Sequence, residues 1–247
     1  MIQIAILITV FFTSLLSGIL GMAGGMILMA VLVSTLSVAA AMILHGAVQA
    51  TANGSRAWFL RHHIRWEILP NYAIGAAIAV GWFMVLAFVP HPGIVLILVG
   101  AFPWLARLSK RLKGLDVMKP VTAIVCGISV TSAQLLAGAS GPLLDVFYLN
   151  TPLTRQEIVA NKAVTQTLGH ILKIAYYGLF IGVFLEIGAE AEAWYIAVAM
   201  AIAVAGTRAG TLILERWSDA EFQKISQIII LTIATYCIAQ GVYLLLG

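Results

Sequence analysis

Two stretches of this chain share one pattern: residues 45–56 have the sequence HGAVQATANGSR, and residues 162–173 have the sequence KAVTQTLGHILK. In each stretch, polar residues recur in steps of four, four and three positions. Because an α-helix has about 3.6 residues per turn, such steps put the polar side chains on one face of a helix. We therefore predict two helices that each carry a polar stripe. The stripes consist of His45, Gln49, Asn53 and Arg56 in the first stretch and of Lys162, Gln166, His170 and Lys173 in the second.

The composition around these stretches is that of an integral membrane protein. Of the 247 residues, 62% are hydrophobic and 10% are charged, whereas a soluble domain is about half apolar and about a quarter charged. A polar stripe that faced lipid would be costly, so both stripes are expected to face a bundle interior or a wet cavity. The net charge of +4 is explained by basic loops at the cytoplasmic surface, and we expect no nucleic-acid partner.

Ten apolar segments divide into two sets of five. We take residues 1–106 as a first transmembrane repeat, 107–119 as a basic cytoplasmic linker and 120–247 as a second transmembrane repeat. Thr154 and Glu157 have the spacing of a capping box at the start of the longest helix. The segments lie at about 2–18, 23–36, 39–60, 71–89 and 93–106, and then at about 120–136, 142–150, 155–185, 194–213 and 224–246.

The distribution of Lys and Arg sets the orientation of these segments. Basic residues cluster at 61–65 and in the linker, whereas the loop with Glu186, Glu190 and Glu192 has none. Because cytoplasmic loops are enriched in Lys and Arg, the acidic loop is expected outside. This arrangement places both termini on the periplasmic side and inverts one half relative to the other. The sequence thus predicts an all-α integral membrane protein of about ten transmembrane segments, built as two inverted five-segment repeats with glycine-broken helices.

Glycine clusters mark a helix break at matching places in the two halves. The offset of 117 positions that aligns the polar stripes also aligns the two clusters. In a transporter, such a break leaves backbone N–H groups and the positive end of a half-helix inside the protein, which suits an anion. Small residues also allow close helix packing, but their matching positions favour the anion interpretation. The clusters are Gly21, Gly24 and Gly25 in the first half and Gly138, Ser140 and Gly141 in the second.

Several polar residues also have a simpler explanation. Gln49 and Gln166 either bind a substrate or form hydrogen bonds between helices. Arg56 lies near a helix end and either lines a pathway or extends to the cytoplasmic interface. Asp145 either carries a proton or pairs with a lysine of the second stripe. No pair of His, Cys, Asp or Glu has metal-binding helical spacing, so we expect neither a metal nor a cofactor.

The chain resembles the sulfite exporter TauE/SafE family of anion transporters. The resemblance rests on Gly18 and the glycine clusters named above, and on the two stripes HGAVQATANGSR and NKAVTQTLGHILK. It covers nearly the whole chain and implies export of sulfite, thiosulfate or a small organosulfonate, driven by the proton gradient. Family members often carry a run of glycines at both breaks, whereas here Pro142 follows Gly141. The resemblance therefore leaves open which anion is moved.

Together, the residues and the resemblance predict a proton-coupled secondary transporter in a bacterial inner membrane. We expect backbone N–H groups of the two breaks, with Gln49, Gln166, Asn53 and His170, to bind the anion near the midplane. Arg56 and Lys173 are expected toward opposite mouths. The proton carrier is either Asp145 or His170, since the unperturbed pKa of a histidine is about 6.5. The sequence leaves open whether the unit is a monomer or a homodimer.

Two other classes of function fit parts of the pattern. A passive anion or weak-acid channel uses the same cationic lining, and its flux ignores a pH gradient. An intramembrane enzyme would use Ser140 as nucleophile and His170 as base. We do not expect an enzyme, because Gly-Ala-Ser-Gly-Pro at 138–142 suits a helix break equally well.

Overall fold

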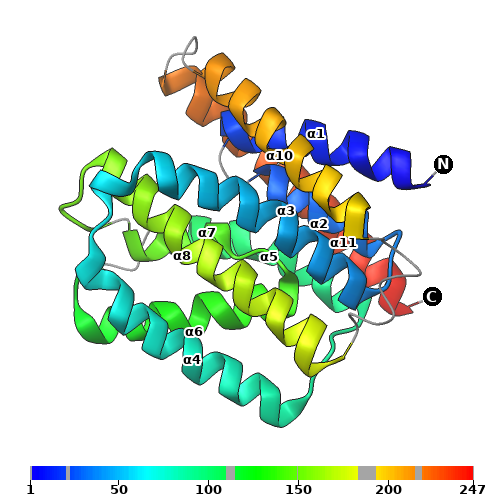
Figure 1. Cartoon of the computed structure of the whole chain (residues 1–247), viewed down its shortest axis with the longest axis horizontal. Helices are drawn as coiled ribbons and strands as arrows, with labels where there is room; N and C mark the ends of the chain where they lie inside the picture. The colour runs from blue at the N-terminus through cyan, green and yellow to red at the C-terminus, as the bar shows by residue number, and fades with distance from the viewer. Residues whose placement is uncertain are drawn as a thin grey trace.

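The computed structural model describes residues 2–20, 23–109, 115–148, 150–182, 193–214 and 219–246. Within these residues the fold is all-helical, as predicted, and contains no strand. Its ten α-helices correspond one to one to the ten predicted segments (Figure 1). They are α1 (Ile2–Leu20), α2 (Ala23–Val33), α3 (Val38–Phe59), α4 (Leu69–Leu86), α5 (Pro92–Ser109), α6 (Pro120–Ala137), α7 (Gly141–Tyr148), α8 (Arg155–Ala175), α10 (Ala193–Leu214) and α11 (Asp219–Leu246).

Local sequence signals set the ends of the central helices. The Ser37 side chain accepts a hydrogen bond from the Ala40 N–H and begins α3. The capping box predicted at Thr154 and Glu157 is confirmed at the start of α8. α6 ends before Gly138, whose φ of 72° is a left-handed conformation that glycine adopts without strain. The break predicted in the second half is therefore present, whereas Gly21 lies outside the described residues.

The segment predicted at 155–185 is not one continuous α-helix. α8 is followed by a π-helical turn, η3 (Tyr176–Phe180), and the acidic loop predicted beyond it lies outside the described residues. The Tyr176 and Tyr177 hydroxyls donate hydrogen bonds to backbone carbonyls of α4 and α6, respectively. These contacts with distant helices accompany the change to a wider turn. No local pattern announces them, which is why the predicted end was wrong.

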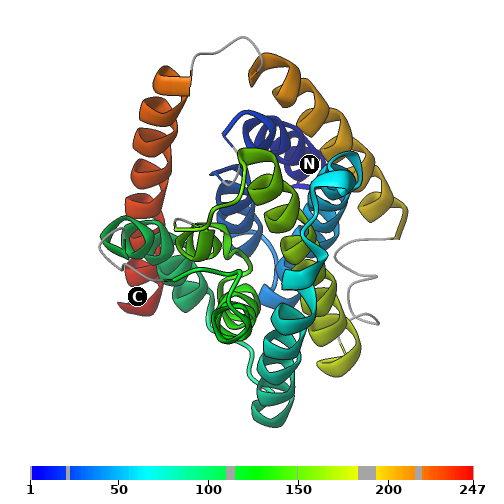
Figure 2. The ribbon, with the colours of Figure 1, turned by 90° about the vertical axis from the view of Figure 1, so that its left-hand side faces the viewer.

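Four helix pairs make the most extensive contacts: α3 with α8, α5 with α11, α1 with α10, and α4 with α6. α3 and α8 run side by side in opposite directions, with α1 and α10 on one flank and α4 and α6 on the other (Figures 1 and 2). A Cβ at Gly127 of α6 would overlap the Tyr72 carbonyl of α4, and a Cβ at Gly210 of α10 would overlap the Leu15 carbonyl of α1. Both flanking pairs therefore depend on close backbone approach.

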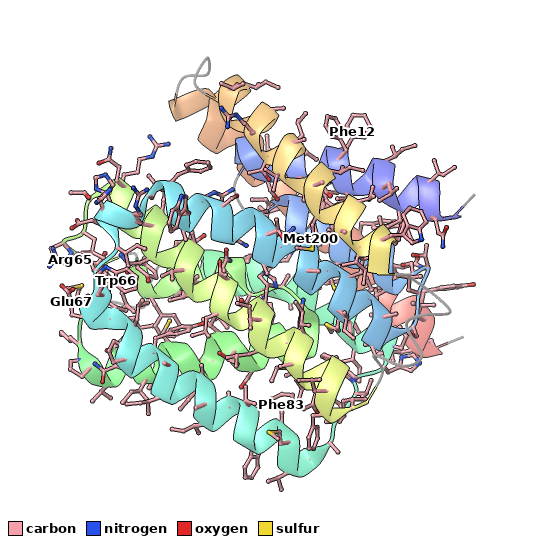
Figure 3. All side chains as sticks on the ribbon, in the orientation of Figure 1. Phe12, Arg65, Trp66, Glu67, Phe83 and Met200 are labelled. Atoms are coloured by element: carbon pink, nitrogen blue, oxygen red, sulfur yellow. The ribbon has the colours of Figure 1, made fainter. Side chains whose placement is uncertain are left out.

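Large apolar side chains cover the outside of the bundle. On α4, exposed residues alternate with a buried face that packs on α6, and Trp82 is 65% exposed. Phe12 points outward from α1 in the same way (Figure 3). A helix that is apolar on every side suits a lipid environment. Among the described residues, three helices are long and apolar enough to cross a membrane, at Trp66–Leu86, Pro120–Ala137 and Ile228–Leu246.

An ion-pair cluster fixes the start of α8 against the connection between α3 and α4. That connection contains two 3-10 helices, η1 (Arg61–His63) and η2 (Trp66–Ile68). Arg65 Nε lies 2.8 Å from Glu67 Oε1, and Arg65 Nη1 lies 3.2 Å from Glu157 Oε1. Figure 3 shows Arg65 and Glu67 at the end of the molecule where α3 passes to α4. The cluster joins the start of α8 to the connection between α3 and α4.

Candidate functional site

Members of both polar stripes, on α3 and on α8, line one shared cavity. Its volume is about 30 Å³, which is room for about two waters. Residues next to both helix breaks reach it, since the starts of α2 and α7 contribute to its wall. Ser17, Gly25, Met26, His45, Gln49, Ala52, Asn53 and Arg56 line it from the first half, and Ala139, Ser140, Gly141, Pro142, Gln166 and His170 line it from the second.

Two buried hydrogen-bond donors at the cavity have no partner. Gln49 is 7% exposed and Ser17 is 4% exposed. Gln49 Nε2 and Ser17 Oγ both lack a hydrogen-bond partner among the described residues. An unsatisfied buried polar group costs about 1–3 kcal/mol. A molecule with hydrogen-bond acceptors in the cavity would remove this cost.

Gly25 keeps the space in front of Gln49 open. It lies in the first turn of α2, and a Cβ there would sit 3.3 Å from Gln49 Nε2. A side chain at this position would therefore crowd the unpaired amide. The first turn of a helix also offers backbone N–H groups without intrahelical partners, so this part of the wall is suited to an anion.

Arg56 brings a cation to the cavity wall. Its Nη2 donates a hydrogen bond to the Ser17 carbonyl at 3.4 Å, one turn before the end of α1. The C-terminal end of a helix carries partial negative charge, which helps to hold the guanidinium there. Arg56 therefore lines the cavity, and its guanidinium has four further N–H donors.

Lys173, the counterpart of Arg56 in the second stripe, lies behind the cavity wall. It is 0% exposed, and its Nζ lies 2.9 Å from both His45 Nδ1 and the Gly138 carbonyl. His45 Nε2 lies 2.9 Å from the Gly25 carbonyl. Because a lysine ammonium only donates and a carbonyl only accepts, this arrangement assigns His45 a neutral ring with its proton on Nε2. The network ties α2, α3 and α8 to the end of α6.

Gln134 joins two of the predicted site residues and was missed from the sequence. Ser140 Oγ donates to Gln134 Oε1, and Gln134 Nε2 lies 2.6 Å from His170 Nδ1 and 3.0 Å from His170 Nε2. Gln134 aligns with Ser17 at the same offset of 117 positions, so the alignment contained the signal. The Ser140 hydroxyl donates to this amide, which lies between Ser140 and His170.

Asp145 forms an ion pair with Lys162, one of the partners considered from the sequence. The pair joins α7 to α8 outside the cavity wall. Its side chains are 36% and 19% exposed, respectively, so it lies nearer to the surface than the network around Lys173. Among the described residues, no group of three or more His, Cys, Asp or Glu side chains is placed to hold a metal ion.

The structure thus separates the predicted site residues into two groups. Those at the cavity are Gly25, Gln49, Asn53, Arg56, Ser140, Gly141, Gln166 and His170. Gly24 packs instead against the Thr13 carbonyl and Ser17 of α1, and Gly138 forms the end of α6. Lys173 and Asp145 are engaged elsewhere, as described, and Gly21 falls outside the described residues.

One family model matches the chain. The model described as "Sulfite exporter TauE/SafE" matches residues 6–237. No curated protein and no solved structure gives a significant match.

Proposed function

Since the chain belongs to the sulfite exporter TauE/SafE family of membrane transporters, we propose that it is a proton-coupled secondary transporter that exports a small sulfur-containing anion. The observation that supports the proposal is the cavity between α3 and α8, where Gln49 Nε2 and Ser17 Oγ have no hydrogen-bond partner among the described residues. The anion binds there, where residues of both halves meet.

The chemistry of the cavity wall supports an anion over a cation. The wall contains the guanidinium of Arg56, two histidines and the amides of Gln49, Asn53 and Gln166, and none of its residues is Asp or Glu. Preorganised donors of this kind bind oxyanions because they replace the hydration that the ion loses.

The pattern of helix contacts supports a duplicated, inverted architecture. If α1 to α5 correspond in order to α6, α7, α8, α10 and α11, exchanging the halves turns the α1–α10 pair into the α6–α4 pair. The same exchange leaves the α3–α8 and α5–α11 pairs unchanged. All four principal pairs obey this rule. The cations obey it too, because Arg56 contacts the end of α1 and Lys173 contacts the end of α6.

In this mechanism the two repeats rock around the anion and open the cavity to one side at a time. The network of Lys173, His45, Gly25 and Gly138 closes one side, while Arg56 lines the open part of the cavity. The basic loops orient the protein with their side toward the cytoplasm of a bacterial cell, and both termini are periplasmic. The proton gradient acts through His170, whereas Asp145 is engaged by Lys162.

The test is a current measurement on proteoliposomes adsorbed to a solid-supported membrane. Concentration jumps of sulfite, thiosulfate, sulfoacetate and chloride are applied with and without a pH gradient. We expect a saturable current with a sulfur oxyanion that responds to the gradient and is lost in Arg56→Ala. The matched control is Thr167→Val, because among the described residues the Thr167 hydroxyl bonds within α8, to the Ala163 carbonyl.

Three results would contradict the proposal in different ways. An unselective current that is indifferent to pH indicates the passive channel. A normal current in Arg56→Ala places the anion outside this cavity. No current with any of the four anions rejects anion transport by this protein.

A further inference from the structure

Gln134 occupies an unusual position relative to the cavity. It is 1% exposed and does not line the cavity, whereas both of its partners, Ser140 and His170, do. Its amide accepts from Ser140 at one end and contacts the His170 ring at the other. Any change in the charge of His170 is therefore transmitted to Ser140 through one side chain.

With neutral His170, the donors and acceptors fall in one order. Gln134 Nε2 donates to an imidazole nitrogen, and Gln134 Oε1 accepts the hydroxyl proton of Ser140. A serine hydroxyl has only one proton to donate. Ser140 therefore presents lone pairs to the cavity in this arrangement, and lone pairs do not favour an anion.

With protonated His170, this order cannot persist. An imidazolium has two N–H donors and no acceptor, so the Gln134 amide must turn its oxygen toward the ring. Its nitrogen then faces Ser140 and donates to Oγ. The Ser140 proton is released from Gln134 and can point into the cavity, where it becomes a donor to an anion.

We propose that Gln134 is a positioning residue that couples protonation of His170 to anion binding by this amide rotation. The inference rests on the proposed anion site between α3 and α8. Protonation of His170 and anion binding in the cavity then favour each other, because each stabilises the amide orientation that the other requires. By linkage, anion affinity must then rise as the pH falls.

The charged groups around His170 strengthen the dependence of its protonation on a bound anion. The ring centroid of His45 on α3 lies 5.5 Å from that of His170. The Lys173 ammonium on α8 donates a hydrogen bond to His45 Nδ1. Arg56 on α3 shares the cavity wall. These cations oppose a further positive charge on His170 until an anion enters and offsets them. Asp145 on α7 is held by Lys162, and the tyrosine hydroxyls of η3 bond to carbonyls of α4 and α6.

The experiment measures the affinity of the purified protein for thiosulfate at pH 6 and pH 8 by titration calorimetry. Thiosulfate is used because, unlike sulfite, it does not itself take up a proton in this range. We expect the wild-type Kd to be about tenfold lower at pH 6, the effect of about one gained hydrogen bond to a charged ligand. A pH indicator in weak buffer should report proton uptake on binding.

Two variants separate positioning from a purely structural role. In Ser140→Ala the released donor is missing, so its Kd should match the wild type at pH 8 and be about tenfold higher than the wild type at pH 6. In Gln134→Leu the amide that links Ser140 to His170 is absent, so the Ser140 hydroxyl no longer responds to the charge of His170. Its Kd should become independent of pH. Thr167→Val is the control and should keep the wild-type pH response.

Each contrary result overturns a defined statement. A wild-type Kd that is equal at the two pH values, or lower at pH 8, overturns the coupling while leaving the anion site intact. A Ser140→Ala variant that keeps the wild-type pH response overturns the role of the amide rotation. If none of sulfite, thiosulfate or sulfoacetate binds at either pH, the proposed function itself fails, and this inference fails with it.

Discussion

Arg56 and Lys173 occupy matching positions in the two polar stripes, and their surroundings differ. Each donates a hydrogen bond to a backbone carbonyl at the end of the helix before a break, Arg56 to Ser17 at 3.4 Å and Lys173 to Gly138 at 2.9 Å. Arg56 lines the cavity, whereas Lys173 is fully buried and holds His45 as well. Of the two cations at equivalent positions, one thus lines the cavity and the other is fully buried behind its wall.

This difference shows how a duplicated sequence serves an asymmetric structure. If both halves had the same conformation, the cavity would be equally open or equally closed at both cations. In the proposed mechanism, the half that is closed here opens when the repeats rock, and Arg56 and Lys173 exchange their roles. Matched variants of Arg56 and Lys173 test this difference through their stability and their transport activity.

The largest effect is expected from Lys173→Met. The substitution leaves the Gly138 carbonyl and His45 Nδ1 without their donor in a buried site, and should lower the free energy of unfolding by about 3 kcal/mol. Arg56→Met should lower it by less than about 1 kcal/mol, because Arg56 makes one long hydrogen bond next to a cavity. Thermal unfolding in detergent, followed by tryptophan fluorescence, checks this. An equal loss of unfolding free energy in the two variants would mean that Arg56 and Lys173 contribute equally to stability, which contradicts their different surroundings.

Arg56→Ala should have the next largest effect, on transport. Loss of a charged donor at the cavity should raise the KM for the exported anion about 10- to 100-fold with little change in thermal stability. Arg56→Lys should recover part of the loss, because the charge remains but the planar fork does not. Current measurements over a range of anion concentrations give these constants. Full recovery by lysine would show that charge alone matters at this position.

Gln49→Leu should have a smaller effect on transport, and it compares the two glutamines of the polar stripes. Gln49 Nε2 has no partner among the described residues, so removing it should raise KM about tenfold without lowering stability. The same substitution at Gln166, its counterpart on α8, tests whether the second half contributes equally. A loss of stability in Gln49→Leu without a change in KM would instead indicate an interhelical role for this amide.

Asp145→Asn is expected to have the smallest effect. Its ion pair with Lys162 is partly exposed, and such pairs contribute less than about 1 kcal/mol. If His170 carries the proton, the pH dependence of transport should remain that of the wild type. A current that loses its response to a pH gradient in Asp145→Asn would assign the proton to Asp145 instead.

Much of the fold was predictable because periodicity and breaks are local signals. The ten segments, the capping box at Thr154 and the break at Gly138 follow from patterns of hydrophobic, capping and glycine residues. The end of α8 did not follow, because tyrosines of η3 bond to carbonyls on distant helices. Contacts of this kind depend on packing that no single segment specifies.

The sequence predicted which residues belong to the site better than it predicted how they contact one another. A shared face identified Gln49, Asn53 and His170, since helical spacing determines which side chains point the same way. The spacing did not reveal that Lys173 is sealed behind His45, because that depends on how α6 ends. Gln134 was missed because it belongs to neither polar stripe, although its match to Ser17 at the same offset carried the signal.

Binding of the anion between α3 and α8 is tested most directly by anomalous diffraction from crystals soaked in selenite, a heavier analogue of sulfite. The protein is produced with ordinary methionine, so that selenite is the source of selenium. We expect a selenium peak in the cavity between α3 and α8, placed so that the selenite oxygens accept hydrogen bonds from Gln49 Nε2 and the Arg56 guanidinium. A peak elsewhere, or an empty cavity at a concentration of selenite that blocks sulfite current, would contradict it.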